Sequence, residues 1–120
     1  MKRELRNVLF EKYPKLFQQK DRLEKEGSIS CDDKWFDLID NLCGNIQQRV
    51  ERVNRGIRNR IKNSPPTLVP TRSEVFTCEV LQIKEKFGIL RFYTTGGDDY
   101  IDGLITMAMS IVKPTDQGKK

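Results

Sequence analysis

The sequence predicts an α+β domain in which helices cover one face of a small antiparallel hairpin. Apolar residues recur every three or four positions through residues 35–61, which is typical of one long helix with a single buried face. Residues 74–94 form two runs rich in β-branched and aromatic residues, separated by a glycine-containing turn, as in a β-hairpin. A last amphipathic stretch, residues 98–112, predicts a C-terminal helix. This order of elements favours helices packed on one side of a small sheet.

The chain length of 120 residues suits one domain with a single core. Hydrophobic residues make up 37% and charged residues 32%, a composition that supports folding. We expect one domain over residues 1–114 and a loose tail over 115–120. No apolar run approaches the roughly 20 residues of a membrane span or forms a signal peptide. The three cysteines lack a Cys-x-x-Cys spacing, which favours free thiols and a cytoplasmic location.

Two short helices are expected at the N-terminus, over residues 2–12 and 15–24, separated by Pro14. Gly27 then ends the second helix, and Asp32 or Asp33 caps the next one. The expected buried contacts are Leu5, Val8 and Leu9 in the first helix, and Leu16, Phe17 and Leu23 in the second.

The long helix over residues 35–61 would extend ~40 Å, so it must project past the rest of a small domain or brace it. Gly44 and Gly56 each weaken it by roughly 1 kcal/mol relative to Ala, which allows a kink or a frayed end after Arg55. The part of the stripe from Cys43 to Ile57 also matches a heptad seam, which raises the possibility of a homodimer through this helix. The stripe consists of Trp35, Leu38, Ile39, Leu42, Cys43, Ile46, Val50, Val53, Ile57 and Ile61.

Residues 63–73 carry three prolines and predict an extended connector. In the strand that follows, the alternation of apolar residues changes phase near Val80 and Leu81, which indicates a β-bulge. The hairpin loop is expected to be three to five residues long, with Gly88 at positive φ.

The string GGDDY, residues 96–100, resembles the signature of diguanylate cyclases, but it follows a strand and opens a helix. Gly96 and Gly97 suit a sharp strand-to-helix turn, and Asp98 or Asp99 suits an N-cap. We therefore interpret the string as architecture. The last helix is expected to bury Ile101, Leu104, Ile105, Ala108, Ile111 and Val112 and to stop before Pro114.

Catalysis is not indicated by this sequence. It contains no histidine, so the commonest general base and metal ligand is missing, and Cys43 falls on an apolar helix face. Cys43 and Cys78 are expected to be buried structural thiols. We predict no enzymatic activity, no catalytic residues, no cofactor and no metal site.

The segments WFDLIDNLC (35–43) and QIKEKFGILRFYTTGGDDYIDGLI (82–105) together resemble a family of short phage and prophage proteins. Its members carry Trp-[Phe/Tyr]-x-Leu-Ile, then Gln-[Val/Ile]-Lys-Glu-Lys-Phe-Gly-x-Leu-Arg-Phe-Tyr and a Gly-Gly-Asp before a helix. LRNVLFEKYPKLF (5–17) is similar to the usual start of that family. The resemblance implies no established activity. Many members continue into a Cys-x-x-Cys cluster typical of a metal knuckle, which these 120 residues lack, so no zinc site is carried over.

The net charge of +5 resides in one segment, residues 49–62, which holds six basic residues against Glu51 alone. Typical solvated helix faces mix both signs, so this segment is the best candidate for partner binding, although a merely solvated face is the alternative. Its guanidinium groups suit carboxylates of a protein as well as phosphates of a nucleic acid. On a helix, Arg55, Arg58 and Lys62 lie opposite the apolar stripe, and Arg49, Arg52 and Arg60 flank it.

The turn KEKFG, residues 84–88, is a second candidate contact. It is either a solvated turn of alternating charge or a tip that inserts into a groove of a partner. In the second case Lys84, Lys86 and Arg91 would meet acidic groups or phosphates.

The sequence and the resemblance together predict a small phage-encoded accessory protein in the host cytoplasm that acts by binding. The expected action is inhibition of a host protein or ribonucleoprotein complex, as in counter-defence of the anti-CRISPR kind. The alternative is a nonspecific nucleic-acid-binding protein that uses the basic helix 49–62. No sequence-specific nucleic-acid motif accompanies the arginines.

Overall fold

The long helix predicted at the centre of the chain organises the fold. The computed structural model describes residues 1–62 and 76–112 of the chain, with Ile61 and Lys62 described by their backbone alone. Its elements are α1 (Arg3–Lys12), α2 (Lys20–Glu26), β1 (Ile29–Ser30), the 3-10 turn η1 (Asp33–Trp35), α3 (Phe36–Lys62), β2 (Cys78–Lys86), β3 (Ile89–Gly96) and α4 (Asp99–Ile111). The α+β class and the order of the main elements are confirmed. The predicted connector 63–73 and the tail 115–120 lie outside the described residues.

The sheet has three strands in the order β1-β2-β3, one more than the hairpin predicted from the sequence. β2 and β3 pair antiparallel, and the two-residue strand β1 pairs parallel to β2, with Ile29 opposite Ile83. A strand this short leaves no detectable alternation in a sequence. The predicted bulge is confirmed, because the register shifts between Val80 and Gln82.

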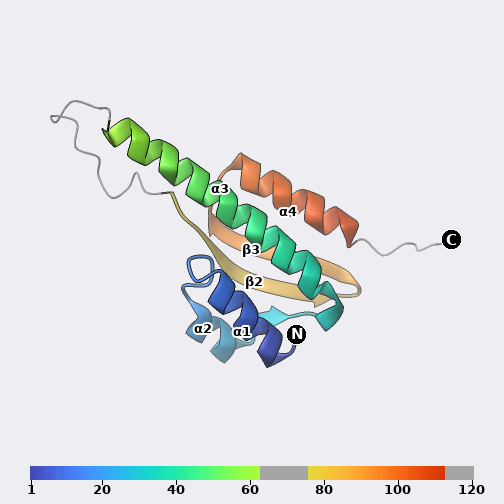
Figure 1. Ribbon diagram of the computed structural model, residues 1–120. Coiled ribbons are helices and arrows are strands. Elements are labelled where there is room, and N and C mark those ends of the chain that lie inside the picture. Colours follow the sequence, from blue (N-terminus) through green and yellow to red (C-terminus); the bar gives the residue numbers. More distant parts are fainter. Residues whose placement is uncertain (63–75, 113–120) are drawn as a thin grey trace.

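Two helices lie along the sheet (Figure 1), where α4 runs back antiparallel to the first half of α3. The end of α3 projects past the strands, on the side away from the hairpin turn. Gly56 does not interrupt α3, which continues through it to Lys62. The N-terminal helices α1 and α2 lie beside β2 (Figure 1).

The N-terminal region corrects two sequence-based expectations. The second helix begins at Lys20, and residues 14–19 form turns. The reason lies in Leu16 and Phe17, which are both buried, while the carbonyl of Leu16 accepts a hydrogen bond from Val80 N–H of β2 at 2.8 Å. The Leu16 carbonyl is thus directed at the sheet, and Lys20 N–H, its partner in a regular α-helix, donates to Phe17 O instead. Val8 is 37% exposed, and Phe10 is buried in its place against Phe17.

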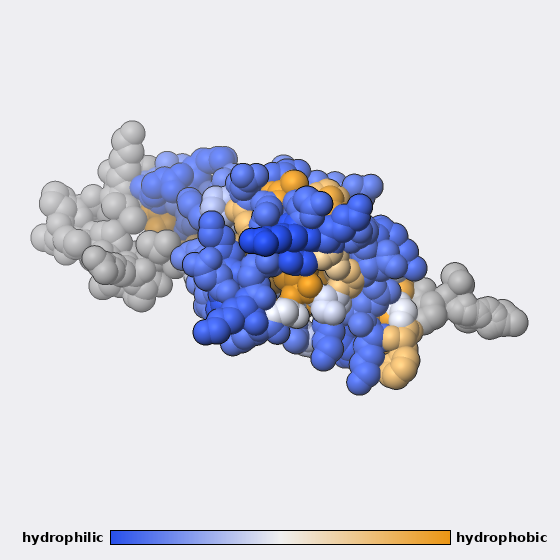
Figure 2. Space-filling model, turned by 90° about the horizontal axis from the view of Figure 1, so that it is seen from below, coloured by the Kyte–Doolittle hydropathy of each residue, from blue (hydrophilic) through white to orange (hydrophobic). Residues whose placement is uncertain are grey.

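The core lies between α3, α4, the N-terminal helices and the sheet. Leu9, Ile39, Cys43, Ile46, Ile83 and Ile101 are fully inaccessible. The first half of the α3 stripe therefore packs inside its own chain, while Val53 and Ile57 are only half-buried. Figure 2 shows that the surface seen from below is mostly hydrophilic, with small apolar patches between polar side chains.

The hairpin turn is shorter than the predicted three to five residues. Lys86 pairs with Ile89, so Phe87 and Gly88 alone form the loop, with φ of 56° and 78°. Positive φ at both central residues is the pattern of a type I′ turn, whose twist matches that of the strands. Gly88 meets this demand as predicted. Phe87 does not suit it, and its side chain is 87% exposed.

The glycines before α4 have the architectural role predicted for them. Gly96 has a φ of 79°, and a Cβ there would lie 2.4 Å from the carbonyl oxygen of Thr77. Asp98 is the N-cap, and its carboxylate accepts from Ile101 N–H at 3.1 Å. The expected burial of Ile111 is wrong, because that side chain is 63% exposed. It lies on a face of α4 that no described element covers.

Candidate partner-binding surface

The first half of α3 is tied to the start of α4 through Arg49. Arg49 Nε and Nη2 lie 3.0 and 2.8 Å from Asp98 Oδ2, and the guanidinium stacks on Tyr100 with its carbon 4.6 Å from the ring centroid. Burial disfavours the Asp98 carboxylate, but hydrogen bonds from Ile101 N–H and Arg49 outweigh it and hold its pKa below the usual value. Arg49, one of the predicted partner-binding residues, thus has a clear structural role.

Asn54 fixes the point at which α3 leaves the body of the protein. Its side-chain amide donates to Phe76 O at 2.9 Å, and its amide oxygen accepts from Phe76 N–H at 2.8 Å. Both backbone groups of Phe76, just before β2, are thereby satisfied. Asn54 therefore ties the middle of α3 to the residues that precede β2.

Arg52, Arg55 and Arg58 form what we call the basic face of α3. All three side chains are exposed. On the helix, Arg52 and Arg55 lie opposite Val50 and Ile57, and Arg58 lies to one side of them, so Arg52 rather than Arg58 faces away from the stripe. Within the described residues they form no ion pair or hydrogen bond. Arg60 is also exposed but has an interaction of its own, and the side chain of Lys62 lies outside the described residues.

The hairpin brings three further predicted residues together on one surface. Lys84 lies opposite Arg91 in the register, and Lys86 follows on the same face two residues later. All three are exposed, and we call them the cationic face of the hairpin. Lys86 Nζ lies 5.6 Å from the centroid of the Phe87 ring.

Glu85 does not neutralise the cationic face of the hairpin, because its carboxylate lies on the opposite face of the strand and accepts hydrogen bonds from residues that precede α3. It accepts from Asp32 N–H at 2.8 Å and from Trp35 Nε1 at 3.0 Å. The charges that alternate along the sequence of the turn are therefore separated in the fold. The lysines face solvent, and Glu85 is directed at the start of α3.

The two basic surfaces lie far apart. The hairpin turn is next to the beginning of α3, whereas the basic face lies toward its projecting end (Figure 1). At ~1.5 Å per residue, about 20 residues of helix separate them by ~30 Å. The structure does not combine the predicted site residues into one patch, so each surface is considered by itself.

The described residues contain no cluster suited to a metal ion, and their thiols are buried. No group of three or more Cys, Asp or Glu side chains within 1–62 and 76–112 is placed to hold a metal ion. All three cysteines are free and buried. Burial raises the pKa of Cys31 to about 11 and also raises that of Cys43 and Cys78, so these thiols stay protonated near neutral pH.

No family model, curated protein or solved structure matches the chain. None of the described helices is long and apolar enough to cross a membrane.

Sequence reasoning missed two features of these surfaces. Asn54 lies beside the apolar stripe of α3, and a polar residue at such a position could have indicated a buried hydrogen-bonding role. Phe87 could have been identified by counting back from Gly88, since a two-residue loop places Phe87 at the tip. The alternating strand pattern alone allows both loop lengths.

Proposed function

We propose that this chain is a small accessory protein of the phage type that acts by binding in the cytoplasm of a host cell. In this proposal the basic face of α3 docks on an acidic surface of a host protein or ribonucleoprotein complex and blocks it. The resemblance of residues 35–43 and 82–105 to phage proteins motivates the host as the source of the partner.

One observation carries the proposal. Arg52, Arg55 and Arg58 are exposed and without ion pairs among the described residues, whereas Arg49, three residues earlier on the same helix, is committed to Asp98. Arginines that stabilise a fold are paired in this way, since an unpaired exposed arginine adds little to stability. Three unpaired arginines on a projecting helix therefore suit contact with another molecule.

The chemistry of the basic face defines its partner. Guanidinium groups bind carboxylates in a two-pronged geometry, and three of them favour an acidic surface several ångströms long. The complementary charges would accelerate association and make it dependent on salt. The helix would act as a rigid projection that covers the acidic surface and excludes the natural ligand of the host complex.

The test is co-purification of tagged protein with host lysate, with and without nuclease, followed by isolation of the captured complex. We expect a stoichiometric complex that survives nuclease treatment. A triple variant with Glu at Arg52, Arg55 and Arg58 should not form this complex. A control with Lys15, Lys20 and Lys25 changed to Glu has the same net charge. Those lysines are exposed and form no ion pair among the described residues, so the control should bind normally.

The other outcomes separate the alternatives. Binding that nuclease removes, and that falls steeply with salt on any duplex, would replace this proposal with nonspecific nucleic-acid binding. Equal loss of binding in both triple variants would show that net charge alone matters. Unchanged binding of the arginine variant would exclude the basic face as the interface.

A further inference from the structure

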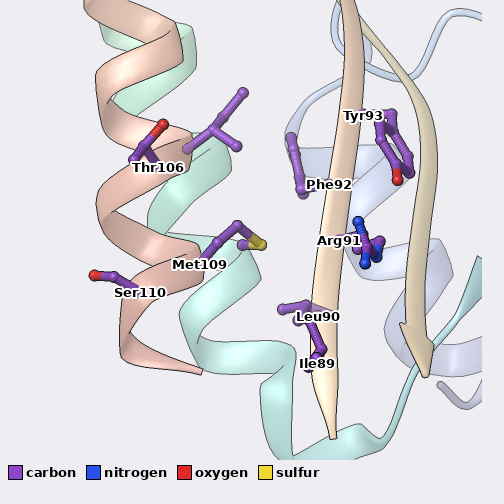
Figure 3. Close-up of a pocket in the computed structure, with 9 residues that line it drawn as sticks. Ile89, Leu90, Arg91, Phe92, Tyr93, Thr106, Met109 and Ser110 are labelled. Atoms are coloured by element: carbon purple, nitrogen blue, oxygen red, sulfur yellow. The ribbon is translucent and has the colours of Figure 1, made fainter. Parts of the chain in front are cut away.

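A groove lies between β3 and α4, along the edge of the sheet that β3 forms. Its volume is about 690 Å³, within the roughly 300–1,000 Å³ of typical ligand sites. Figure 3 shows Met109 reaching from α4 toward β3, with Thr106 and Ser110 above and below it on the helix. The lining residues are Ile89, Leu90, Arg91, Phe92 and Tyr93 of β3 and Ile105, Thr106, Met109 and Ser110 of α4.

The groove follows the open edge of β3. Five consecutive residues of the strand line it, although their side chains alternate between the two faces of the sheet. Leu90 and Phe92 lie on the α4 side of the strand, and Arg91 and Tyr93 lie on the other side (Figure 3). Only the edge of a strand exposes residues of both faces to one groove. β3 is an outer strand of the described sheet, paired with β2 alone.

This edge carries backbone groups that are available for pairing. In a two-residue hairpin the residues beside the loop, here Lys86 and Ile89, form a hydrogen-bonded pair, and such pairs then alternate along the ladder. The N–H and C=O groups of Leu90 and Phe92 therefore point away from β2. Outside the ladder these groups form no backbone hydrogen bond within residues 1–62 and 76–112. An exposed strand edge of this kind is a template for another strand.

The opposite wall of the groove is uncharged. From Gly103 to its end at Ile111, α4 contains no acidic or basic residue in a chain that is 32% charged. Ile105 and Met109 are half-buried beside the groove, and Met107 is 69% exposed farther round the helix. An added strand would therefore place apolar side chains against α4 and leave its backbone to pair with β3.

The charge on the outer face of the sheet indicates which strand fits. A residue of an added strand that lies next to Arg91 would face a cation that already has Lys84 as its cross-strand neighbour. An acidic side chain there would gain a favourable pair. A second copy of the chain that paired through its own β3 would bring Arg91 of that strand, with Lys84 of its β2, to the same face, and like charges on adjacent strands are destabilising. Charge complementarity thus favours a different, acidic strand over a homodimer.

We infer that the β3–α4 groove binds an extended peptide segment of a partner protein, which adds to β3 as a further strand. The segment would alternate apolar residues, directed at Ile105 and Met109, with an acidic residue beside Arg91. This mode of recognition combines main-chain hydrogen bonds for affinity with side-chain pockets for specificity. Five residues of β3 provide a ladder of ~17 Å. The inference does not depend on the basic face of α3.

The test begins with selection of short linear peptides from a displayed random library on the full-length protein. Selected peptides should alternate apolar and polar positions and carry an acidic residue, and their binding is measured by fluorescence anisotropy of a labelled synthetic copy. Two methylated versions of that copy are then compared, one with methyl groups on the odd-numbered backbone amides and one with methyl groups on the even-numbered amides. Only one version should lose binding, because only alternate amides face β3.

Matched variants then locate the site. Thr106→Trp fills the groove from an exposed position on α4 and should weaken binding at least about tenfold, equivalent to about 1.4 kcal/mol. Met107→Trp places the same ring on the next residue, which does not line the groove, and should leave binding unchanged. Arg91→Glu should reverse the preference for acidic peptides. Circular dichroism and urea unfolding identify any variant that fails to fold, and Ser110→Trp then replaces Thr106→Trp.

Three results would overturn the inference. The first is a selection that enriches no peptide, and the second is binding that Thr106→Trp and Met107→Trp affect equally. The third is a concentration-dependent dimer in sedimentation experiments that Thr106→Trp dissociates, since a second copy would then occupy the edge. The arginine variants used to test the proposed function retain the groove, so failure of one proposal is distinguishable from failure of the other.

Discussion

The two halves of α3 have the same pattern of apolar and basic residues and differ in what packs against them. Up to Asn54, the helix buries Ile39, Cys43 and Ile46 and pairs Arg49 with the N-cap of α4. Beyond Asn54, Ile57 is half-buried, and Arg55 and Arg58 are exposed. The difference shows that neither an apolar stripe nor a basic run can be assigned a role without knowing what faces it. What a residue faces separates Ile46 and Arg49, which contact the rest of the fold, from the exposed basic face.

The largest expected effect contrasts buried and half-buried positions of the same stripe. Ile46→Ala should destabilise the protein by about 2–5 kcal/mol, because it removes fully buried methyl groups and leaves a cavity. Ile57→Ala should cost less than half as much, since this side chain is half-buried in the projecting part. Urea unfolding monitored by circular dichroism measures both. Equal losses would show that the second half of α3 is as integral to the core as the first.

Asn54 marks the boundary between the halves, and its loss should rank next. Asn54→Ala removes both hydrogen bonds to the backbone of Phe76 and leaves partly buried groups unsatisfied, at a cost of about 1–3 kcal/mol. Asn54→Asp keeps the acceptor for Phe76 N–H but loses the donor, so it should be intermediate. Both are compared by urea unfolding at neutral pH. A neutral Asn54→Ala would contradict the role of Asn54 as the boundary.

The pairing of Arg49 with Asp98 should appear in the pH dependence of stability. Because the folded pKa of Asp98 is depressed, its contribution is present above the unfolded value of about 3.9 and is lost as pH falls through the folded value. Asp98→Asn keeps an N-cap but loses the charge, so it should cost about 1 kcal/mol at pH 7.

The same variant should lose less stability than the wild-type protein on acidification. Urea unfolding at pH 7 and at successive values below pH 4 gives both curves. The difference between wild type and Asp98→Asn should narrow toward the acid end. A difference that stays constant with pH would mean that the Asp98 charge does not stabilise the folded state.

Phe87 extends the comparison to the hairpin, where this residue has an unfavourable backbone conformation. A phenylalanine at positive φ in a type I′ turn is unfavourable, and Asn is preferred at this position. Phe87→Asn should therefore stabilise the protein by about 0.5–1 kcal/mol, measured as a rise in the urea midpoint without a change in slope. Destabilisation would indicate that the exposed ring has a packing role.

The smallest expected effect belongs to the basic face of α3. Changing Arg52, Arg55 and Arg58 together to Gln should alter the free energy of unfolding by no more than about 0.5 kcal/mol, because these groups are exposed and unpaired. Arg49→Gln, a single change on the same helix, should cost more than the triple change. The reverse order would mean that the comparison between the two halves of α3 is wrong.

The main elements could be predicted from the sequence because they have strong periodicity. Features that depend on contacts between distant residues could not be predicted. The α3 stripe, the bulge beside Leu81 and the Asp98 cap each leave a local signal in the sequence, and the structure confirms them. The start of α2 at Lys20 depends on a hydrogen bond from β2 to Leu16, about sixty residues away. Local propensity carries no information about such a partner.

The candidate sites follow the same division. The concentration of arginines in residues 49–62 is visible in the sequence, but the separation of Arg49 from the basic face depends on where Asp98 lies in space. The cationic face of the hairpin likewise depends on Glu85 being directed toward Trp35. The β3–α4 groove left no signal, because it arises from the open edge of β3 and from the way α4 lies beside that edge, neither of which a local pattern reveals.

The central claim is that the basic face of α3 serves a partner and that the lysines of equal charge elsewhere do not. The most direct test is calorimetric titration of the isolated host partner with two charge-matched variants at physiological salt. The first variant has Gln at Arg52, Arg55 and Arg58, and it should raise the dissociation constant by about tenfold or more. The second variant has Gln at Lys15, Lys20 and Lys25, and it should leave the dissociation constant unchanged. Equal dissociation constants for the two variants would contradict the claim.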